Sequence, residues 1–260
     1  MRIKGCLLAA AIGIVVGSIS QSHAQQTSLI VATLTNEDSA SVTRFWKPWA
    51  QAVETSSNGA LKMDVRNGYA IASLNNSLDR LSDDVVQVTG VFHGSWPGRF
   101  PLSEVAGLPF MTQKSEEAGL ALWRLYKTGL LDSELKDFVP LAMCTYGYSG
   151  LHLVKQPDAL DDLKGLKIVT ASKIQSDMLV LLGASPSSAT PMDAYPALQR
   201  GTYAGILTSW AGVQAFHLNE VTNYHVDAAL GTTTEMVAMT RTRYNALPEA
   251  ARKALDANSG

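Results

Sequence analysis

Apolar and polar positions along the chain alternate between two periods, which predicts a mixed α/β protein. The β-rich run Leu29–Leu34 precedes apolar residues at helical spacing from Val42 to Val53, and an alternating strand follows from Leu61 to Val65. Pro48 predicts either a kink in the helix or a second start within it. Asn58-Gly59 ends the helix. The first segment of the chain is therefore predicted to form a βαβ-like unit.

The same alternation continues to about residue 145. We place the aromatic rings of Phe45, Trp46 and Trp49 in the core that the first helix covers. In a later helix, which Ser115 caps, we expect Leu120, Leu122, Trp123 and Tyr126 to face inward. The further elements expected here are helices at 75–82, 115–129 and 133–138 and strands at 85–92 and 139–145.

A second set of elements begins after residue 150, with strands expected at 151–154, 166–169 and 204–207 and helices at 175–182 and 190–201. Pro196 would break a hydrogen bond if the last helix began at Thr190, so we predict Asp193 as its N-cap. Two sets of strands and helices predict two α/β lobes. We assign lobe I to 25–146, lobe II to 147–234 and a return to lobe I to 235–260. A last helix begins near Leu247, and the chain stops soon after it, so we expect the sequence to be incomplete at its C-terminus.

The first residues have the pattern of a cleaved secretory leader. Arg2 and Lys4 precede the apolar run Cys6–Val16, and Ser22-His23-Ala24 forms a small-x-small cleavage site. The run has about 11 residues, short of the roughly 20 that span a bilayer. We therefore predict a signal peptide at 1–24 and a periplasmic protein. Cys144 is the one cysteine beyond it, so the mature chain forms no internal disulfide.

Charge and motifs favour a binding protein over an enzyme. The chain carries 21 basic and 23 acidic residues, without the basic surface that nucleic-acid binding requires. Gly147-Tyr148-Ser149-Gly150 only faintly resembles a nucleophile elbow. A secreted hydrolase using Ser149 and His152 is retained as an alternative. The histidines show no metal-ligand spacing, and we expect no cofactor, no metal, no nucleic-acid partner and a monomer.

Several stretches resemble the extracytoplasmic solute-binding subunit of tripartite ATP-independent periplasmic (TRAP) transporters. The resemblance implies a type II periplasmic-binding-protein fold, in which two α/β lobes are joined by hinge strands with the ligand cleft between them. It also implies a small organic solute as ligand, a membrane permease as partner and no catalysis. The hinge strands would lie near Met143–Tyr148 and Met236–Thr240, and a long bracing helix would follow the end of the chain. The matching stretches are Phe45–Leu61, Phe100–Phe110, Leu163–Ile168, Gly183–Pro186 and Tyr195–Gly201.

The chain departs from the family pattern where a carboxylate would bind. The family resemblance implies an arginine after the Lys-Ile pair of the "KGLKI" strand, and this chain has Val169 there. A second family arginine falls near Ser149, and a ligand-contacting asparagine falls at Thr208. Arginine binds carboxylates through two charge-assisted hydrogen bonds, so its loss weakens the case for simple C4-dicarboxylates. Either the ligand lacks a carboxylate here, or another cation such as Arg99 or Lys173, or a bound metal, meets it.

The residues expected near the strand ends are mostly aromatic or neutral and polar, which suits an aromatic, amphipathic or weakly charged organic solute. Trp210 could stack on a ligand or fill a core, and Tyr146 and Tyr148 could instead pack the hinge. The same residues would serve a binding lobe of a sensor or of another transport system. The predicted ligand-binding residues are Asn36, His93, Trp96, Tyr146, Tyr148, Ser149, Val169, Thr208 and Trp210.

Overall fold

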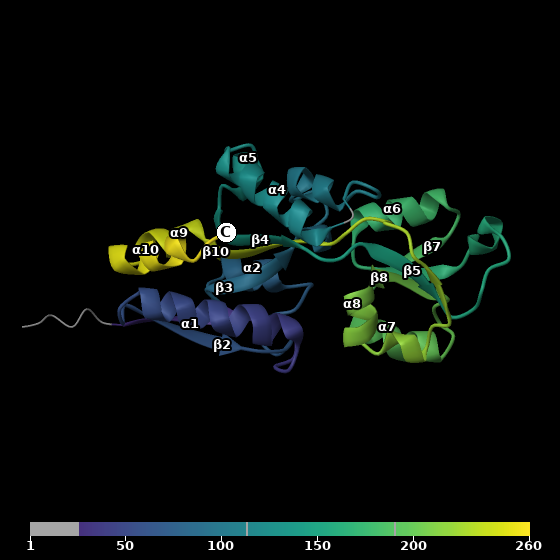
Figure 1. Ribbon diagram of the computed structural model, residues 1–260, viewed down its shortest axis with the longest axis horizontal. Helices are drawn as coiled ribbons and strands as arrows, with labels where there is room; N and C mark the ends of the chain where they lie inside the picture. The colour runs from purple at the N-terminus through teal and green to yellow at the C-terminus, as the bar shows by residue number, and fades with distance from the viewer. Residues whose placement is uncertain (1–25, 113, 190) are drawn as a thin grey trace, which may run out of the picture.

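Two β-sheets divide the described part of the chain into two α/β lobes (Figure 1). The computed structural model describes residues 26–112, 114–189 and 191–260, so the predicted signal peptide lies outside it. One sheet contains strands from 27–145 and 234–240, and the other contains strands from 149–226. The expected two-lobe α/β architecture is confirmed.

The sheet of lobe I has the strand order β2-β1-β3-β10-β4. β1 runs parallel to β2 and β3, and β10 runs antiparallel to β3 and β4. Helices α1 and α10 cover one face, where Trp49 of α1 donates to the carbonyl of Asn258 (2.9 Å). The strands are β1 (Thr27–Ala32), β2 (Leu61–Arg66), β3 (Val88–Phe92), β4 (Phe138–Thr145) and β10 (Thr234–Thr240), and the helices are η1 (Val42–Trp46), α1 (Lys47–Ser56), α2 (Ser77–Ser82), η2 (His93–Ser95), α3 (Pro101–Glu104), η3 (Val105–Gly107), α4 (Ser115–Lys127), α5 (Asp132–Leu135), α9 (Arg241–Ala246) and α10 (Glu249–Ala257).

The sheet of lobe II has the strand order β7-β6-β8-β5-β9. β6 is parallel to β7 and β8, whereas β5 is antiparallel to β8 and β9. Leu179 of α6 joins the core on one face, and α7 and α8 cover the other face. The strands are β5 (Ser149–Leu153), β6 (Lys167–Thr170), β7 (Ser185–Ser188), β8 (Gly205–Ser209) and β9 (Tyr224–Val226), and the helices are η4 (Leu160–Leu163), α6 (Lys173–Leu181), α7 (Pro191–Gln199), α8 (Trp210–Ala215) and η5 (Leu218–Glu220).

The chain crosses between the lobes at 146–148 and again at 227–233, and the two crossings lie side by side. The amide of Tyr146 donates to the carbonyl of Thr233 (3.0 Å), and the amide of Ser149 donates to the carbonyl of Gly231 (2.7 Å). The second crossing precedes the range expected from sequence, because Met236–Thr240 pairs with β3 and β4 inside lobe I.

Two apolar residues predicted to face the core are exposed. Leu120 of α4 is 48% exposed, because it lies about 200° around the helix from the buried Leu122. Phe45 lies in η1, a π-helical turn, and is 36% exposed, whereas Trp46 and Trp49 are buried as expected. After this turn α1 starts at Lys47, so Pro48 stands in its first turn, where a missing N–H costs little.

The prediction for α7 is wrong. The helix begins at Pro191, so Asp193 is not its N-cap and Pro196 lies inside the helix. Thr190, the rejected alternative, lies outside the described residues. The early start buries Ala194 and Leu198 against β8, and this packing outweighs the one backbone hydrogen bond that Pro196 removes.

Candidate functional site

A cavity of about 160 Å³ lies between the lobes, beyond the carboxyl ends of β6 and β7. In open α/β sheets this is the position where ligands bind. The wall from lobe I follows β3 and precedes α2, whereas the wall from lobe II surrounds the start of α6. The lining residues are Leu74, Asn75, Gly94, Ser95, Pro97, Thr170, Ala171, Ser172, Lys173, Ser176, Ser188 and Ala189.

The lobes touch beside this cavity at Gly94 and Ser172. A Cβ atom on Gly94 would lie only 3.2 Å from the Cα and 3.3 Å from the Cβ of Ser172. Charged groups of the two lobes also interact across the interlobe gap. Burial raises the pKa of Glu104 in lobe I, and the Lys173 ammonium in lobe II opposes that rise. The contact therefore depends on a glycine, and a charge from each lobe lies close to it.

Val169 does not reach the cavity. It is fully buried among Ala194, Leu198, Ile206 and Val213, in the core between the sheet and helices α7 and α8. The next residue, Thr170, lines the cavity and donates to Oε1 of Gln175 (2.7 Å). The position where the family resemblance implies an arginine is thus an apolar core position in this chain.

The two cations suggested by the sequence have different surroundings. Arg99 donates to the carbonyl of Glu134 (2.9 Å) and pairs with Asp137 (3.2 Å), and its guanidinium lies over the Phe100 ring. Lys173 pairs with Asp177 one turn along α6. Among the described residues that line the cavity, Lys173 alone carries a positive charge.

The buried His93 and the partly buried Trp96 of lobe I follow β3. Nδ1 of His93 lies 3.0 Å from Oγ1 of Thr234. Burial lowers the pKa of His93 from 6.5 to about 3, so the ring is neutral. Nε2 of His93 and Nε1 of Trp96 have no hydrogen-bond partner among the described residues. Unsatisfied buried polar atoms of this kind call for a water or a ligand group.

A buried carboxyl group that the sequence did not point to lies at the same edge of lobe I. Tyr146 donates to Oε2 of Glu235 (2.8 Å), and the thiol of Cys144 lies 3.6 Å from the same atom. Burial raises the pKa of Glu235 from 4.5 to about 7, and these two hydrogen bonds oppose part of that rise. Tyr146 stacks on Phe92 with ring centroids 5.4 Å apart, and a side chain on Gly90 would collide with Oε1 of Glu235.

Lobe II carries an aromatic cluster at its corresponding edge. Tyr148 and Trp210 both donate to Oδ1 of Asp227, at 2.8 Å and 3.1 Å. These hydrogen bonds lower the pKa of Asp227. The indole of Trp210 also lies against the rings of His152 and His225, with centroids 5.0 and 5.1 Å away. The sequence pointed to Tyr148 and Trp210 as ligand-binding residues and to His152 only in the hydrolase alternative, whereas Asp227 and His225 were missed.

The remaining predicted residues are dispersed. Asn36 is exposed, the carbonyl of Thr208 lies 3.1 Å from Nε2 of His152, and Oγ of Ser149 accepts from Gln175 (2.8 Å). Ser149 and His152 are three residues apart on β5, so their side chains point to opposite faces of the sheet. The described hydrogen bonds thus give them separate partners rather than a serine–histidine pair. Within the described residues, no group of three metal-ligating side chains is placed to hold a metal ion.

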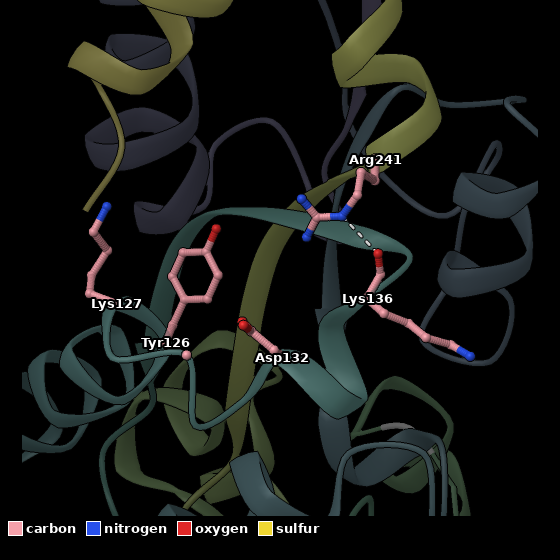
Figure 2. A pocket seen from close by; sticks show the side chains of 6 residues that line it. Tyr126, Lys127, Asp132, Lys136 and Arg241 are labelled. Carbon is pink, nitrogen blue, oxygen red and sulfur yellow. Dashed lines mark hydrogen bonds between the residues drawn. The ribbon is translucent and has the colours of Figure 1, made fainter.

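A larger hollow, of about 510 Å³, lies on lobe I away from these residues (Figure 2). It is lined by Tyr126, Lys127, Gly129, Asp132, Lys136 and Arg241. Arg241 donates to the carbonyl oxygens of Lys136 (2.7 Å) and Phe138 (2.8 Å), so it ties α9 to the start of β4. The hollow brings together none of the predicted ligand-binding residues, and we assign its arginine a structural role.

Comparison with known proteins identifies the family. The model of the family "Bacterial extracellular solute-binding protein, family 7" (DctP) matches residues 31–259. The chain belongs to this family. A curated relative, "Outer membrane transporter protein TsaT" of Comamonas testosteroni, is 26% identical over 92% of this chain and 72% of its own length.

Solved structures of TRAP solute-binding proteins share the fold. One from Rhodoferax ferrireducens T118, in complex with copurified benzoate, is 32% identical, with a TM-score of 0.82 over 90% of this chain and 75% of its own. Another, from a marine metagenome, is specific for aromatic acid ligands and was crystallised with 3-hydroxybenzoate. It is 28% identical, with a TM-score of 0.83 over the same 90% and 75%.

These findings establish the general function. The DctP-family chain is a TRAP solute-binding protein, which captures a small organic solute between its lobes and delivers it to the membrane permease subunits. None of the helices in the described residues is long and apolar enough to cross a membrane.

Proposed function

We propose that this protein is exported to the periplasm by its cleaved signal peptide and there binds an aromatic carboxylic acid for TRAP transport. The observation that carries this proposal is Lys173, the positive charge on the wall of the interlobe cavity. The chain that carries Lys173 is 28% identical to a protein with 3-hydroxybenzoate bound and 32% identical to one with benzoate bound.

The chemistry of the cavity supports a monocarboxylate with an apolar body. One ammonium group, at Lys173, can pair with one carboxylate, and the hydroxyls of Ser172 and Ser176 stand beside it. Leu74, Pro97 and Ala189 add apolar surface to a wall that otherwise carries neutral polar side chains. A second carboxylate would find no second cation among the described residues of this wall, which disfavours its burial. The loss of arginine at Val169 therefore favours aromatic monocarboxylates over C4-dicarboxylates.

Thermal shift and calorimetric titration with benzoate and 3-hydroxybenzoate test the proposal, because a ligand that binds the native state raises Tm. We expect Lys173→Met to weaken benzoate binding by about tenfold or more, as for a lost hydrogen bond to a charged group. Lys164→Met is the matched control, since Lys164 is also exposed on lobe II and paired along its own segment, with Asp161. Equal losses in both variants, or no aromatic-acid binding by the wild type, would contradict the proposal.

A further inference from the structure

The exposed indole of Trp210 is held more firmly than its exposure suggests. The side chain is 44% exposed, yet its N–H is bonded to Asp227 and two imidazole rings lie against it. Exposed aromatic side chains without such contacts move between rotamers, and that freedom is lost on binding. An indole already fixed in place avoids this loss and is a preorganised contact surface.

The strand register of the lobe II sheet brings this indole to the cleft edge of lobe II. β8 is parallel to β6, whose last residue Thr170 lines the cavity, and Trp210 directly follows the carboxyl end of β8. Ser149 is paired with Ser209, so Tyr148 and Trp210 lie beside one another at that edge. Asp227 begins the second crossing and accepts hydrogen bonds from the side chains of both Tyr148 and Trp210. The cluster thus joins the two crossings to the edge of the sheet where the ligand cavity lies.

The histidines behind the indole form a pair with defined proton positions. His152 and His225 are direct partners across β5 and β9, and their Nδ1 atoms are 2.9 Å apart. Nε2 of His152 faces the carbonyl of Thr208 (3.1 Å), and because a carbonyl only accepts, Nε2 carries the hydrogen. Nδ1 of a neutral His152 is then the acceptor, and Nδ1–H of His225 donates to it. Both rings are fixed, so the indole rests on a rigid support.

We propose that Trp210 is the stacking surface for the aromatic ring of the ligand, and that Asp227 is the positioning residue that holds it. This inference rests on the proposed function and adds the group that selects a ring over an aliphatic body. The single oxygen Oδ1 accepts from both Trp210 and Tyr148, so removing it frees both side chains at once. The acceptor oxygen of Asp227, rather than its negative charge, positions the two rings.

The test compares benzoate with cyclohexanecarboxylate, which keeps the carboxylate and the size but lacks the π-system. Aromatic stacking of about 0.5–1.5 kcal/mol corresponds to a twofold to tenfold preference for benzoate. We expect the wild type to show this preference and Trp210→Leu or Trp210→Met to abolish it. Asp227→Ala should also reduce it, whereas Asp227→Asn, whose amide oxygen still accepts both hydrogen bonds, should retain it. Asp158→Ala, at another exposed aspartate of lobe II, is the control and should have no effect.

The outcomes separate this inference from the proposed function. Wild-type binding of benzoate with an unchanged preference in both Trp210 variants would overturn the stacking role alone. Loss of the preference in Asp227→Asn to the same extent as in Asp227→Ala would overturn the positioning role, because charge rather than the acceptor oxygen would then matter. Failure of the wild type to bind either probe would overturn the proposed function and this inference together.

Discussion

The two sides of the ligand cleft are built differently. Lobe I presents two buried titratable groups at the edge of its sheet, His93 and Glu235, the latter bonded to Tyr146. Lobe II presents exposed groups beyond its strand ends, Lys173 and Trp210, and keeps an apolar residue, Val169, inside. Lobe I thus keeps its titratable groups buried, whereas the groups that we propose to meet the ligand stand exposed on lobe II.

The largest expected effect comes from restoring the family's charge to lobe II. Val169→Arg would bury a guanidinium in the apolar core of α7 and α8, and we expect it to lower the free energy of unfolding by at least about 3 kcal/mol. Val180→Arg is the matched control at a position on α6 that is 58% exposed, and it should change stability by less than about 0.5 kcal/mol. Urea unfolding measures both. A stable Val169→Arg variant that binds succinate tightly would show that this strand end does reach the cleft.

The second prediction concerns His93 in lobe I. Its pKa is lowered to about 3, so between pH 6.5 and 3 the unfolded chain gains a proton that the folded chain does not. Stability is therefore lost as pH falls through this window, by about 3 kcal/mol between pH 7 and pH 4. His93→Gln should lose less stability than the wild type between pH 7 and pH 4 in urea unfolding. Parallel losses in the two proteins would contradict the buried neutral state.

The third prediction concerns Glu235 and has the opposite sign. Its pKa is raised to about 7, so between pH 4.5 and 7 the unfolded carboxyl ionises while the folded one stays protonated. Stability is lost as pH rises through this window and the loss persists above it, on the order of 3 kcal/mol. Glu235→Gln should therefore be stabilised relative to the wild type at pH 8 more than at pH 4.5. The exposed Glu249→Gln is the control and should show no such gain.

The sequence predicted the layers of this molecule better than its site. Helical and strand periods are local, so the two lobes and most element positions follow from them, and Val169 was found because it stands in a recognisable strand. Glu235 and Asp227 could not be found this way. They bind Tyr146 and Tyr148 across 89 and 79 residues, and no pattern near either acid indicates such a partner. The early start of α7 was missed because burial of Ala194 and Leu198 outweighs the local signal of Pro196.

The fourth prediction tests whether ligand binding requires the contact between Gly94 of lobe I and Ser172 of lobe II. Gly94→Ala places a Cβ about 3.2 Å from Ser172, and Gly94→Val adds more bulk, so the lobes cannot close fully. Overpacking of about 1–3 kcal/mol corresponds to roughly fivefold to 150-fold weaker ligand binding, larger for valine than for alanine. Tm without ligand should change little. Gly147→Ala is the control, since its Cβ would lie 3.8 Å from its nearest neighbour. Unchanged affinity in Gly94→Val would mean that binding does not require this contact.

The most direct measurement is a calorimetric titration of the wild-type protein with benzoate and with succinate under the same conditions. We propose that the cleft binds an aromatic monocarboxylate through Lys173 at the rim, with Val169 in place of a core arginine. Benzoate should then bind at least about tenfold more tightly than succinate. Tighter binding of succinate would contradict it.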